Sequence, residues 1–372
     1  MKFTILDEKE FASVQNTMPY SSFYQTTAWA QIKAKNGWEC FYVGIKNENS
    51  VIAASLLLAK KLFLNKKMFY APRGLLLDYS NVELLTFFTN KLKSFITSHG
   101  GILLKIDPLV EYKHRDMDGK IMDDGFDNEK IYQKLLDLGY KHEGFTVGYS
   151  KEAQFRWSYG LDITPSKDEI LKGMNQRCRR CLKKANKYSL TRVDVTKDNI
   201  QDFKAIMEHT AVRQNHFDRS VSYYLDLLEI LKDRIKMSII YLDKQKFLKD
   251  FPDDKLVELI KKEKEDMIPI SAGVFIFDAD RANYVYGGTY SHYMPLMAQY
   301  KMQMDMIEIA QEKKLPLYDF GGISGDFTPG TPNYGVYEFK KGFGGFVIEY
   351  IGEFNLVIHP FYSGLYNTMY GT

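Results

Sequence analysis

One segment of the chain concentrates positive charge. Residues 172–187 contain seven lysines and arginines and no acidic residue. On a helix these side chains cover much of the circumference, and like charges repel one another unless an anion lies among them. The pattern therefore indicates phosphate binding, with a polynucleotide as the natural partner. A solvated surface helix is the alternative that the same residues allow.

Two cysteines, Cys178 and Cys181, lie inside this basic segment. Their spacing is that of half a zinc site or of a redox pair. The third cysteine, Cys40, is distant in the sequence, whereas a structural zinc normally needs four ligands. We therefore expect two small apolar side chains, one turn apart, on the packed face of a helix.

A second segment, residues 336–345, combines aromatic residues, lysines and glycines. It contains Phe339, Lys340 and Lys341, and it follows another glycine-rich stretch at residues 320–326. An aromatic ring can stack on a base while a neighbouring ammonium holds an anion. Neither stretch matches a phosphate loop or a dinucleotide-binding fingerprint. The alternative is a plain loop.

A third cluster lies at residues 209–224, where arginines and tyrosines flank a polar turn. Arg219 immediately precedes a predicted helix, and the amides at a helix N-terminus favour anions. With Tyr223 close behind it, Arg219 fits a clamp for a pyrophosphate or a carboxylate. Surface ion pairing is the alternative.

Familiar catalytic signatures are missing from the sequence. The seven histidines are scattered, no serine has a Gly-x-Ser-x-Gly setting, and no His-Glu-x-x-His pattern occurs. An enzyme built from this chain would work by positioning and electrostatics. We therefore expect neither a metal nor a cofactor.

The composition is that of an ordinary soluble globular protein. Among 372 residues, 45% are hydrophobic and 26% charged, and the net charge of +3 indicates no partner by itself. Sparse cysteines favour a reducing, cytoplasmic location. Acidic residues interrupt the N-terminus too early for a signal peptide. The longest apolar run, residues 51–59, is too short to span a bilayer, so any membrane contact should be peripheral.

Hydrophobic periodicity predicts two α/β units of similar element order. In the first unit we expect helices at 25–35, 82–99 and 130–138, strands at 40–45, 51–58, 68–75 and 102–107, and a loop at 111–128. In the second we expect helices at 166–188, 200–212, 220–232, 296–312 and 360–370, and strands at 193–195, 237–242, 270–277, 282–287, 317–322, 346–351 and 353–358. The matching orders indicate a structural duplication.

Taken together, these segments resemble the Fem-type (FemABX) aminoacyltransferases, which transfer amino acids from aminoacyl-tRNA to the stem peptide of peptidoglycan precursors. The resemblance covers nearly the whole chain. It rests on seven segments in the family's order: residues 23–33, 70–79, 105–108, 175–188, 284–289, 318–323 and 337–344.

The resemblance implies an α/β (α+β) fold of two tandem GNAT-like domains. The first, residues 1–155 plus 352–372, would bind the precursor, and the second would comprise residues 156–351. Its short charged insert, residues 243–268, takes the place of a long coiled coil in the staphylococcal branch. Because residues 244–266 hold seven lysines and seven acids, we expect a solvated helical stub there.

The resemblance also implies roles for individual residues. Lys33, Arg219 and Tyr223 would bind the diphosphate of the precursor, and Tyr286 would line the same groove. Asp107 would lie near the peptide, while Phe339 and Lys340 would meet the end of the aminoacyl-tRNA. The remaining predicted contacts to tRNA are basic: Lys341, Arg177, Arg179, Arg180, Lys183 and Lys184.

The predicted activity is aminoacyl-tRNA-dependent transfer of Gly, Ala or Ser to the stem-peptide lysine of lipid II or UDP-MurNAc-pentapeptide, in interpeptide-bridge formation. Because the ester is already activated, the protein need only orient the reactants and stabilise the oxyanion. Lys340 is our first choice for that donor and Lys341 our second. Asp107 would orient or deprotonate the amine, or else serve only as a strand-end cap.

Two other functions fit parts of the pattern. An acyl-CoA-dependent GNAT-like N-acyltransferase would require acyl-CoA and would be indifferent to ribonuclease. A non-enzymatic tRNA- or RNA-binding module would use the basic segment, but it gives no reason for a diphosphate-type cluster at Arg219.

Overall fold

A computed structural model describes residues 1–149, 154–215 and 217–370 of the chain. The chain divides into two compact units. The first unit comprises Met1–Tyr159, Gly322–Tyr337 and Phe346–Thr372, and the second comprises Gly160–Gly321 and Glu338–Gly345. Segments from the last fifty residues therefore contribute to both units.

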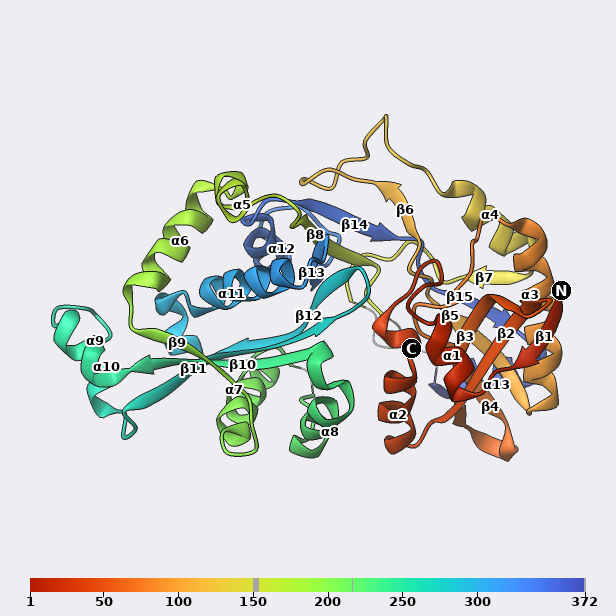
Figure 1. Ribbon diagram of the computed structural model, residues 1–372, viewed down its shortest axis with the longest axis horizontal. Helices are drawn as coiled ribbons and strands as arrows, with labels where there is room; N and C mark the ends of the chain where they lie inside the picture. Colours follow the sequence, from red (N-terminus) through yellow and green to blue (C-terminus); the bar gives the residue numbers. More distant parts are fainter. Residues whose placement is uncertain (150–153, 216, 371–372) are drawn as a thin grey trace. The chain divides into compact units, whose positions relative to one another are not determined.

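Seven strands form the first sheet, in the order β1-β2-β3-β4-β5-β15-β7 (Figure 1). Their bounds are β1 (Lys2–Ile5), β2 (Glu39–Asn47), β3 (Ser50–Lys61), β4 (Lys67–Ala71), β5 (Gly101–Ile106), β15 (Phe354–Val357) and β7 (Tyr140–His142). Neighbouring strands are antiparallel except β4 and β5, which run parallel with Tyr70 beside Lys105. Strand β15 pairs with β5 from far along the sequence, with Phe354 opposite Ile106.

Eight strands form the second sheet, in the order β6-β14-β8-β13-β12-β11-β10-β9. Their bounds are β6 (Glu111–His114), β14 (Phe346–Tyr350), β8 (Trp157–Asp162), β13 (Leu317–Gly322), β12 (Arg281–Thr289), β11 (Met267–Phe277), β10 (Ile235–Asp243) and β9 (Leu190–Asp194). Strands β9 to β12 form an antiparallel meander. Strand β13 then pairs parallel with β12, with Ala282 beside Tyr318.

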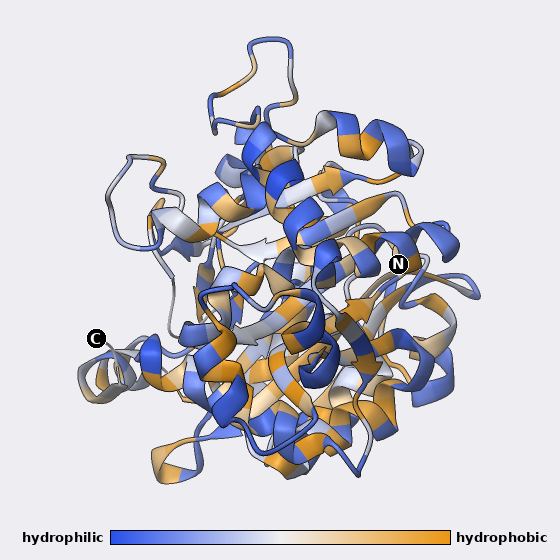
Figure 2. Cartoon of the chain, turned by 90° about the vertical axis from the view of Figure 1, so that its left-hand side faces the viewer, coloured by the Kyte–Doolittle hydropathy of each residue, from blue (hydrophilic) through white to orange (hydrophobic). Residues whose placement is uncertain are grey.

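Helices connect the strands and cover the sheets (Figure 1). Their bounds are α1 (Glu8–Val14), α2 (Thr27–Lys35), α3 (Val82–Ser98), α4 (Glu129–Asp137), α5 (Lys167–Gly173), α6 (Gln176–Lys187), α7 (Ile200–Arg213), α8 (Val221–Leu231), α9 (Lys244–Asp250), α10 (Val257–Lys262), α11 (Ala298–Glu312), α12 (Tyr334–Lys341) and α13 (Pro360–Tyr370). Figure 2 shows hydrophilic and hydrophobic residues alternating along them, as expected of helices with one packed face. No helix within the described ranges has the length and apolar character needed to cross a bilayer.

The first unit is built around a helix that joins two parallel strands. Helix α3 connects β4 to β5 and buries Leu85, Phe88 and Leu92 against the sheet, where Phe69 and Leu104 are fully buried as well. The spacing of three and four residues places these side chains on one helix face. Removing such apolar area from water contributes roughly 25 cal/mol per Å2 to the free energy of folding. Helix α11 makes the same kind of connection between β12 and β13 in the second unit.

Three local expectations from the sequence are wrong. The predicted helix 166–188 is two helices, because Met174 is extended and the Asn175 side chain caps α6 by accepting from Cys178 N–H. The predicted loop 111–128 contains strand β6, which pairs with β14. The glycine-rich stretch 336–345 is not a plain loop, because most of it belongs to helix α12.

The charged insert of the second unit is short and helical, as predicted. Between β10 and β11 it holds the two helices α9 and α10, which contact each other. They bury Phe247 and Ile260 completely, and the Phe247 ring lies 5.7 Å from that of Tyr188. This small apolar cluster anchors the insert to the end of α6.

Candidate active site

Lys340, on helix α12, is a buried lysine whose side chain reaches strand β13. Its Nζ donates to the carbonyl oxygen of Gly321 at 2.9 Å. Gly321 has a φ of 75°, and a Cβ at that position would lie 2.6 Å from the carbonyl oxygen of Tyr284 on β12. Only glycine allows this close approach. The Lys340 side chain therefore reaches the C-terminal end of β13, where that strand approaches β12 closely.

Burial sets the protonation of this amine. Desolvation lowers the pKa of Lys340 to about 7, and the nearby Asp319 carboxylate acts in the opposite direction. Asp319 is itself buried and accepts from the backbone N–H of Gly321 at 2.8 Å. An amine with a pKa close to neutrality is populated in both its charged and its neutral form, which suits a group that acts on reacting atoms.

Helix α6 meets helix α12 beside this amine. The backbone N–H of Asn175, the cap of α6, donates to the carbonyl oxygen of Gly342 at 3.0 Å. A Cβ on Gly342 would lie 3.2 Å from Cβ of Cys178, so the two segments are in close contact. The basic segment and the Phe-Lys-Lys segment, read separately in the sequence, therefore adjoin one another in the second unit.

Helix α6 has one packed face and one exposed face, and the exposed face is basic. Helix α6 packs against α11 (Figure 1). Its packed face consists of Cys178, Cys181, Leu182 and Ala185. The predicted tRNA-binding residues Arg177, Arg179, Arg180 and Lys183 are exposed, and Lys184 is half-buried. Lys184 Nζ lies 5.9 Å from the centroid of the Tyr188 ring, and two of the exposed residues also have protein partners. Arg177 pairs with Glu338 at 2.8 Å, and Arg179 donates to the carbonyl oxygens of Lys172 and Met174.

The cysteines of α6 belong to this packed face, as their spacing predicted. Both are free thiols, and burial raises the pKa of Cys178 to about 12. A thiol with such a pKa is a poor nucleophile and a poor metal ligand at neutral pH. In the part of the chain that the structure describes, no three His, Cys, Asp or Glu side chains are grouped to hold a metal ion.

Phe339 and Lys341 flank the buried amine on α12. The Phe339 ring is half-buried and lies edge-on to Tyr300, with ring centroids 4.9 Å apart. It is also 5.5 Å from the ring of Phe343. Lys341 is half-buried, in contrast to Lys340. The helix thus presents an aromatic ring and a second lysine next to the buried lysine.

A second predicted cluster forms in the same unit around Arg219. Its guanidinium lies 5.4 Å from the centroid of the Tyr223 ring and interacts with the hydroxyl of Tyr286 on β12. Ser220 caps α8 by accepting from the backbone N–H of Tyr223. Next to these residues in the sequence, the Tyr224 hydroxyl donates to the Asp218 carboxylate at 2.6 Å. The structure therefore brings together three of the four predicted precursor-binding residues.

The fourth predicted precursor-binding residue, Lys33, lies on α2 in the first unit. Its Nζ is 5.4 Å from the ring centroids of both Trp29 and Trp38. Cation–π contacts of this kind hold the ammonium against the two rings.

Asp107 directly follows β5 and organises the first unit's candidate site. Its Oδ1 accepts from the backbone N–H of Arg73 at 2.6 Å. Its Oδ2 accepts from the Tyr70 hydroxyl at 2.7 Å and from the backbone N–H of Gln154 at 2.9 Å. Burial and the adjacent carboxylate raise the pKa of Tyr70, so this hydroxyl keeps its proton and donates. A buried carboxylate engaged by three donors is suited to holding its neighbours in place.

Arg73 extends this arrangement into a cavity. Its backbone has a φ of 53°, in the left-handed region, and the hydrogen bond to Asp107 holds it there. Its guanidinium donates to the carbonyl oxygen of Phe155 at 2.7 Å and lies over the rings of Phe155 and Tyr350. The stacked rings fix the direction in which this buried charge points.

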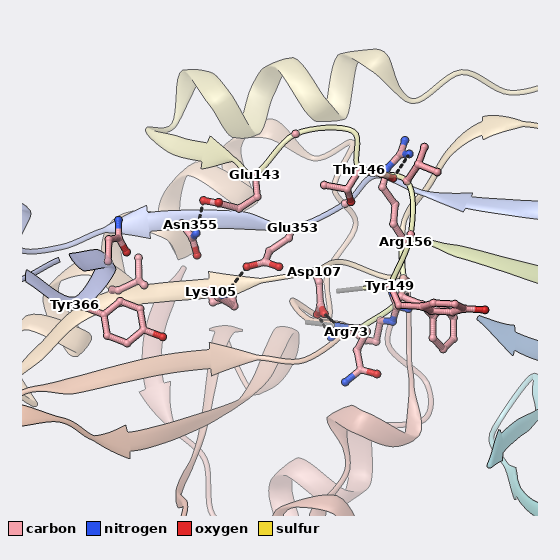
Figure 3. Close-up of a pocket in the computed structure, with 18 residues that line it drawn as sticks. Arg73, Lys105, Asp107, Glu143, Thr146, Tyr149, Arg156, Glu353, Asn355 and Tyr366 are labelled. Carbon is pink, nitrogen blue, oxygen red and sulfur yellow. Dashed lines mark hydrogen bonds and ion pairs between the residues drawn. The ribbon is translucent and has the colours of Figure 1, made fainter. Parts of the chain in front are cut away.

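The cavity beside Asp107 has a volume of about 690 Å3 (Figure 3). Its charged lining is balanced: Arg73, Lys105, Arg156, Asp107, Glu143 and Glu353. Figure 3 shows ion pairing between Lys105 and Glu353 and a hydrogen bond between Asn355 and Glu143. Two lining residues, Arg156 and Asn355, have a buried polar atom with no hydrogen-bond partner among the described residues. Such a lining suits a polar chain that carries charges of both signs.

Several of these residues escaped the sequence reasoning. Arg73, Lys105 and Glu353 were not singled out as functional, and neither was Asp319. Their contacts join segments far apart in the sequence, which no local pattern reveals. The turn residues that flank Arg73, a proline before it and a glycine after it, are the one local signal that could have drawn attention to it.

Known proteins resemble the chain along its full length. Aminoacyltransferase FemA of Staphylococcus aureus (strain bovine RF122 / ET3-1) is 31% identical over 413 aligned positions, which cover 98% of each chain. Aminoacyltransferase FemA of Staphylococcus epidermidis (strain ATCC 35984) is 33% identical, covering 99% of this chain and 98% of the relative. Each alignment is longer than the 372 residues here, so the relatives contain segments with no counterpart in this chain.

Solved structures show the same fold. The crystal structure of FemX matches with a TM-score of 0.83 at 24% identity and covers 100% of both chains. A tandem GNAT protein from the clavulanic acid biosynthesis pathway matches with a TM-score of 0.54 at 9% identity, covering 96% of this chain and 99% of that one. The expected α/β fold of tandem GNAT-like domains is therefore confirmed. The FemAB family matches residues 6–256 and 253–371, and this chain belongs to that family.

Proposed function

We propose that the chain is an aminoacyl-tRNA-dependent aminoacyltransferase. It adds Gly, Ala or Ser to the stem-peptide lysine of a peptidoglycan precursor during formation of the interpeptide bridge. The relatives named aminoacyltransferase FemA support the transfer of an aminoacyl group. One observation carries the proposal: the basic helix α6 is in contact with the end of helix α12. Helix α12 contains Lys340, whose amine is buried.

This contact joins the two features that an aminoacyl-tRNA requires. Exposed cations on α6 suit the phosphates of the tRNA, because counterion release makes such contacts favourable in water. Phe339 and Lys341 suit the terminal adenosine, since a ring stacks on a base and an ammonium holds a phosphate. The aminoacyl ester at that end would then lie next to Lys340.

The reaction needs little covalent chemistry from the protein. The acceptor amine attacks the ester carbonyl carbon, a carbon–nitrogen bond forms, and the bond to the ribose oxygen breaks. The amine loses a proton and the ribose oxygen gains one. Lys340 donates an N–H to the carbonyl oxygen as negative charge develops on it, inside a site from which burial excludes water.

Each unit offers groups that suit the precursor. In the second unit, Arg219, Tyr223 and Tyr286 supply a cation and hydroxyls that suit its diphosphate, and in the first unit Lys33 is a further cation assigned to the same role. The balanced cavity beside Asp107 suits the stem peptide, which carries charges of both signs. Asp107 acts as a positioning residue, because its two oxygens serve three donors of the protein.

A transfer assay tests the function as a whole. Purified protein is given a lipid-linked precursor and total tRNA charged separately with each labelled amino acid. We expect label to enter the precursor from one of the Gly-, Ala- or Ser-tRNA pools and ribonuclease to abolish the transfer. Transfer that persists after ribonuclease and requires acyl-CoA would establish the GNAT-like alternative. Binding of tRNA without any transfer would establish the binding module.

A single substitution tests the role of Lys340. With charged tRNA and precursor both saturating, we expect Lys340→Ala to lower the rate by about two to three decades, the usual cost of losing one oxyanion donor. Lys341→Ala is the matched control on the same helix and should keep most of the rate. Wild-type turnover by Lys340→Ala would refute the oxyanion role.

A further inference from the structure

The last helix of the chain, α13, exposes an apolar stripe. Phe361, Leu365 and Met369 are 68%, 38% and 59% exposed, and their spacing of four residues places them on one face. On the opposite side, the Ser363 hydroxyl donates to the carbonyl oxygen of Ile102 at 2.8 Å and anchors the helix to β5. Pro360–Tyr370 contains no charged residue, which is unusual for a helix with so exposed a face.

A basic loop with an apolar tip adjoins the first turn of α13. From the end of β3 to the start of β4 the chain reads Lys-Lys-Leu-Phe-Leu-Asn-Lys-Lys over residues 60–67, without an acidic residue. Leu64 at its tip is 74% exposed. Lys66 Nζ lies 4.5 Å from the centroid of the Tyr362 ring, so the loop and the helix form one surface.

The charge of this loop remains largely available. Lys67 pairs with Glu39 at 2.6 Å, whereas Lys61 is exposed, and Lys60 and Lys66 lie over the rings of Trp38 and Tyr362. Lys60, Lys61 and Lys66 therefore lie in the same short segment as the exposed Leu64, and Lys66 links this segment to α13. Apolar side chains bordered by lysines and tyrosines are the composition of helices and loops that lie in a lipid interface.

We propose that α13 and the 60–67 loop form a docking surface for an anionic lipid bilayer. Phe361, Leu365, Met369 and Leu64 enter the boundary between headgroups and acyl chains, while Lys60, Lys61 and Lys66 face the lipid phosphates. The inference concerns only the first unit and does not depend on the proposed reaction.

Charge favours a bilayer over a second copy of the chain as the occupant. A two-fold interface through this surface would use the same patch from both copies and would bring lysines towards lysines. An anionic bilayer instead attracts each of these lysines by a factor of roughly five in affinity.

Vesicle sedimentation tests the proposal. The full chain is mixed with vesicles of phosphatidylcholine alone and of phosphatidylcholine with phosphatidylglycerol. We expect the chain to bind the anionic vesicles. Binding should weaken when salt is raised from about 0.1 M to about 1 M, because the screening length falls from about 10 Å to about 3 Å. Replacing the stripe (Phe361→Ser, Leu365→Ser, Met369→Ser) should weaken binding by about tenfold or more.

A second variant addresses charge and does not alter the apolar helix. Lys60→Gln with Lys61→Gln and Lys66→Gln should weaken binding to anionic vesicles by roughly fivefold per lysine. The matched controls are Ile5→Ser with Val82→Ser and Lys2→Gln with Lys9→Gln, which remove exposed residues of the same types elsewhere in this unit. Thermal unfolding measured by circular dichroism verifies that each variant is folded.

The outcomes are distinct. Loss of binding in the stripe and charge variants, with both controls unchanged, supports the docking surface. Absence of vesicle binding by the wild-type chain at about 0.1 M salt would overturn it, as would binding that neither variant weakens. Self-association that the stripe variant abolishes, without vesicle binding, would overturn it in favour of a second copy.

Discussion

The protonation of Lys340 has a consequence for stability that can be measured apart from transfer. Its pKa is about 7 in the folded chain because burial disfavours the ammonium, whereas an unfolded lysine titrates near 10.4. Between these values the unfolded chain binds more protons than the folded chain. The free energy of unfolding therefore rises with pH across this window, by at most about 1.4 kcal/mol per pH unit from this group.

Lys340→Met should remove that dependence. Compared with the wild type, we expect the variant to gain most stability near pH 7 and progressively less towards pH 10, because there the unfolded lysine also loses its proton and folding no longer requires a deprotonation. Denaturant midpoints measured across this range test the expectation. Lys341→Met, on the same helix, controls for the loss of a lysine as such. If the unfolding free energies of the wild type and Lys340→Met changed with pH in parallel, the lowered pKa of Lys340 would be contradicted.

Asp107 offers a second test at the scale of single residues. All three of its partners are donors, so the amide of Asp107→Asn would turn an N–H towards one of them. We expect this variant to lose roughly 1–3 kcal/mol of stability, and Tyr70→Phe, which removes one donor, to lose about 0.5–1.5 kcal/mol. Denaturant unfolding measures both.

The same pair of variants separates positioning from proton transfer. If Asp107 positions its neighbours, Tyr70→Phe should also lower the transfer rate, because it loosens the same carboxylate. A large loss of rate in Asp107→Asn beside a fully active Tyr70→Phe would instead identify Asp107 as the base.

Sequence reasoning reached some of these residues and missed others for a physical reason. Lys340 and Asp107 stand in segments whose types and order resemble a family, so they could be singled out. The importance of Arg73 depends on hydrogen bonds to Asp107 and Phe155, and on a ring contact with Tyr350. These partners are 34 to 277 positions away in the sequence, and only the folded chain shows them.

At the scale of elements, helix α6 is the part whose role is easiest to measure. Arg180 and Lys183 are exposed on its basic face. If each lies near a phosphate, changing both to glutamine should weaken tRNA binding and reduce the slope of log affinity against log salt by about 0.7 to 0.9 per residue. Filter binding over a salt series tests this. Lys197→Gln, in an exposed loop of the same unit, is the control, and an unchanged slope in the double variant would contradict the assignment.

Most elements followed from periodicity, and the failures have identifiable causes. Strand β6 has the polar sequence Glu-Tyr-Lys-His and is a strand because it pairs with β14, more than 200 residues away. The break between α5 and α6 had a local signal, since Asn175 is a good helix cap, but the basic run on both sides concealed it. The glycines within and beside residues 334–341 hid the helical pattern of α12 in the sequence.

At the scale of the whole molecule, the arrangement repeats one plan. Both sheets contain a parallel pair connected by a helix, α3 between β4 and β5 and α11 between β12 and β13. An aspartate stands at each pair, Asp107 just after β5 and Asp319 within β13. The similar element orders in the sequence indicated this repetition. The net charge of +3 did not indicate a partner, because it averages a basic helix and a lysine-rich loop with acidic segments such as residues 111–128.

Helix α13 connects the docking surface to the cavity and so bears on the form of the acceptor. It contributes Tyr366 and Asn367 to the cavity lining, while its apolar stripe faces outward. A helix with its side chains is only about 10–12 Å across. If the stripe enters a bilayer and the cavity holds the stem peptide, the peptide therefore lies within about 10–12 Å of the lipid surface.

A lipid-linked precursor should therefore be preferred over a nucleotide-linked one. We expect the stripe variant to lose roughly tenfold or more in transfer to precursor embedded in anionic vesicles, because docking raises the local concentration of acceptor. Transfer to the soluble nucleotide-linked precursor should not change, since the stripe takes no part in the chemistry. Parallel assays with the two acceptors measure this difference. Equal losses with both would show that α13 acts through the cavity rather than through the membrane, because only a docking defect depends on where the acceptor resides.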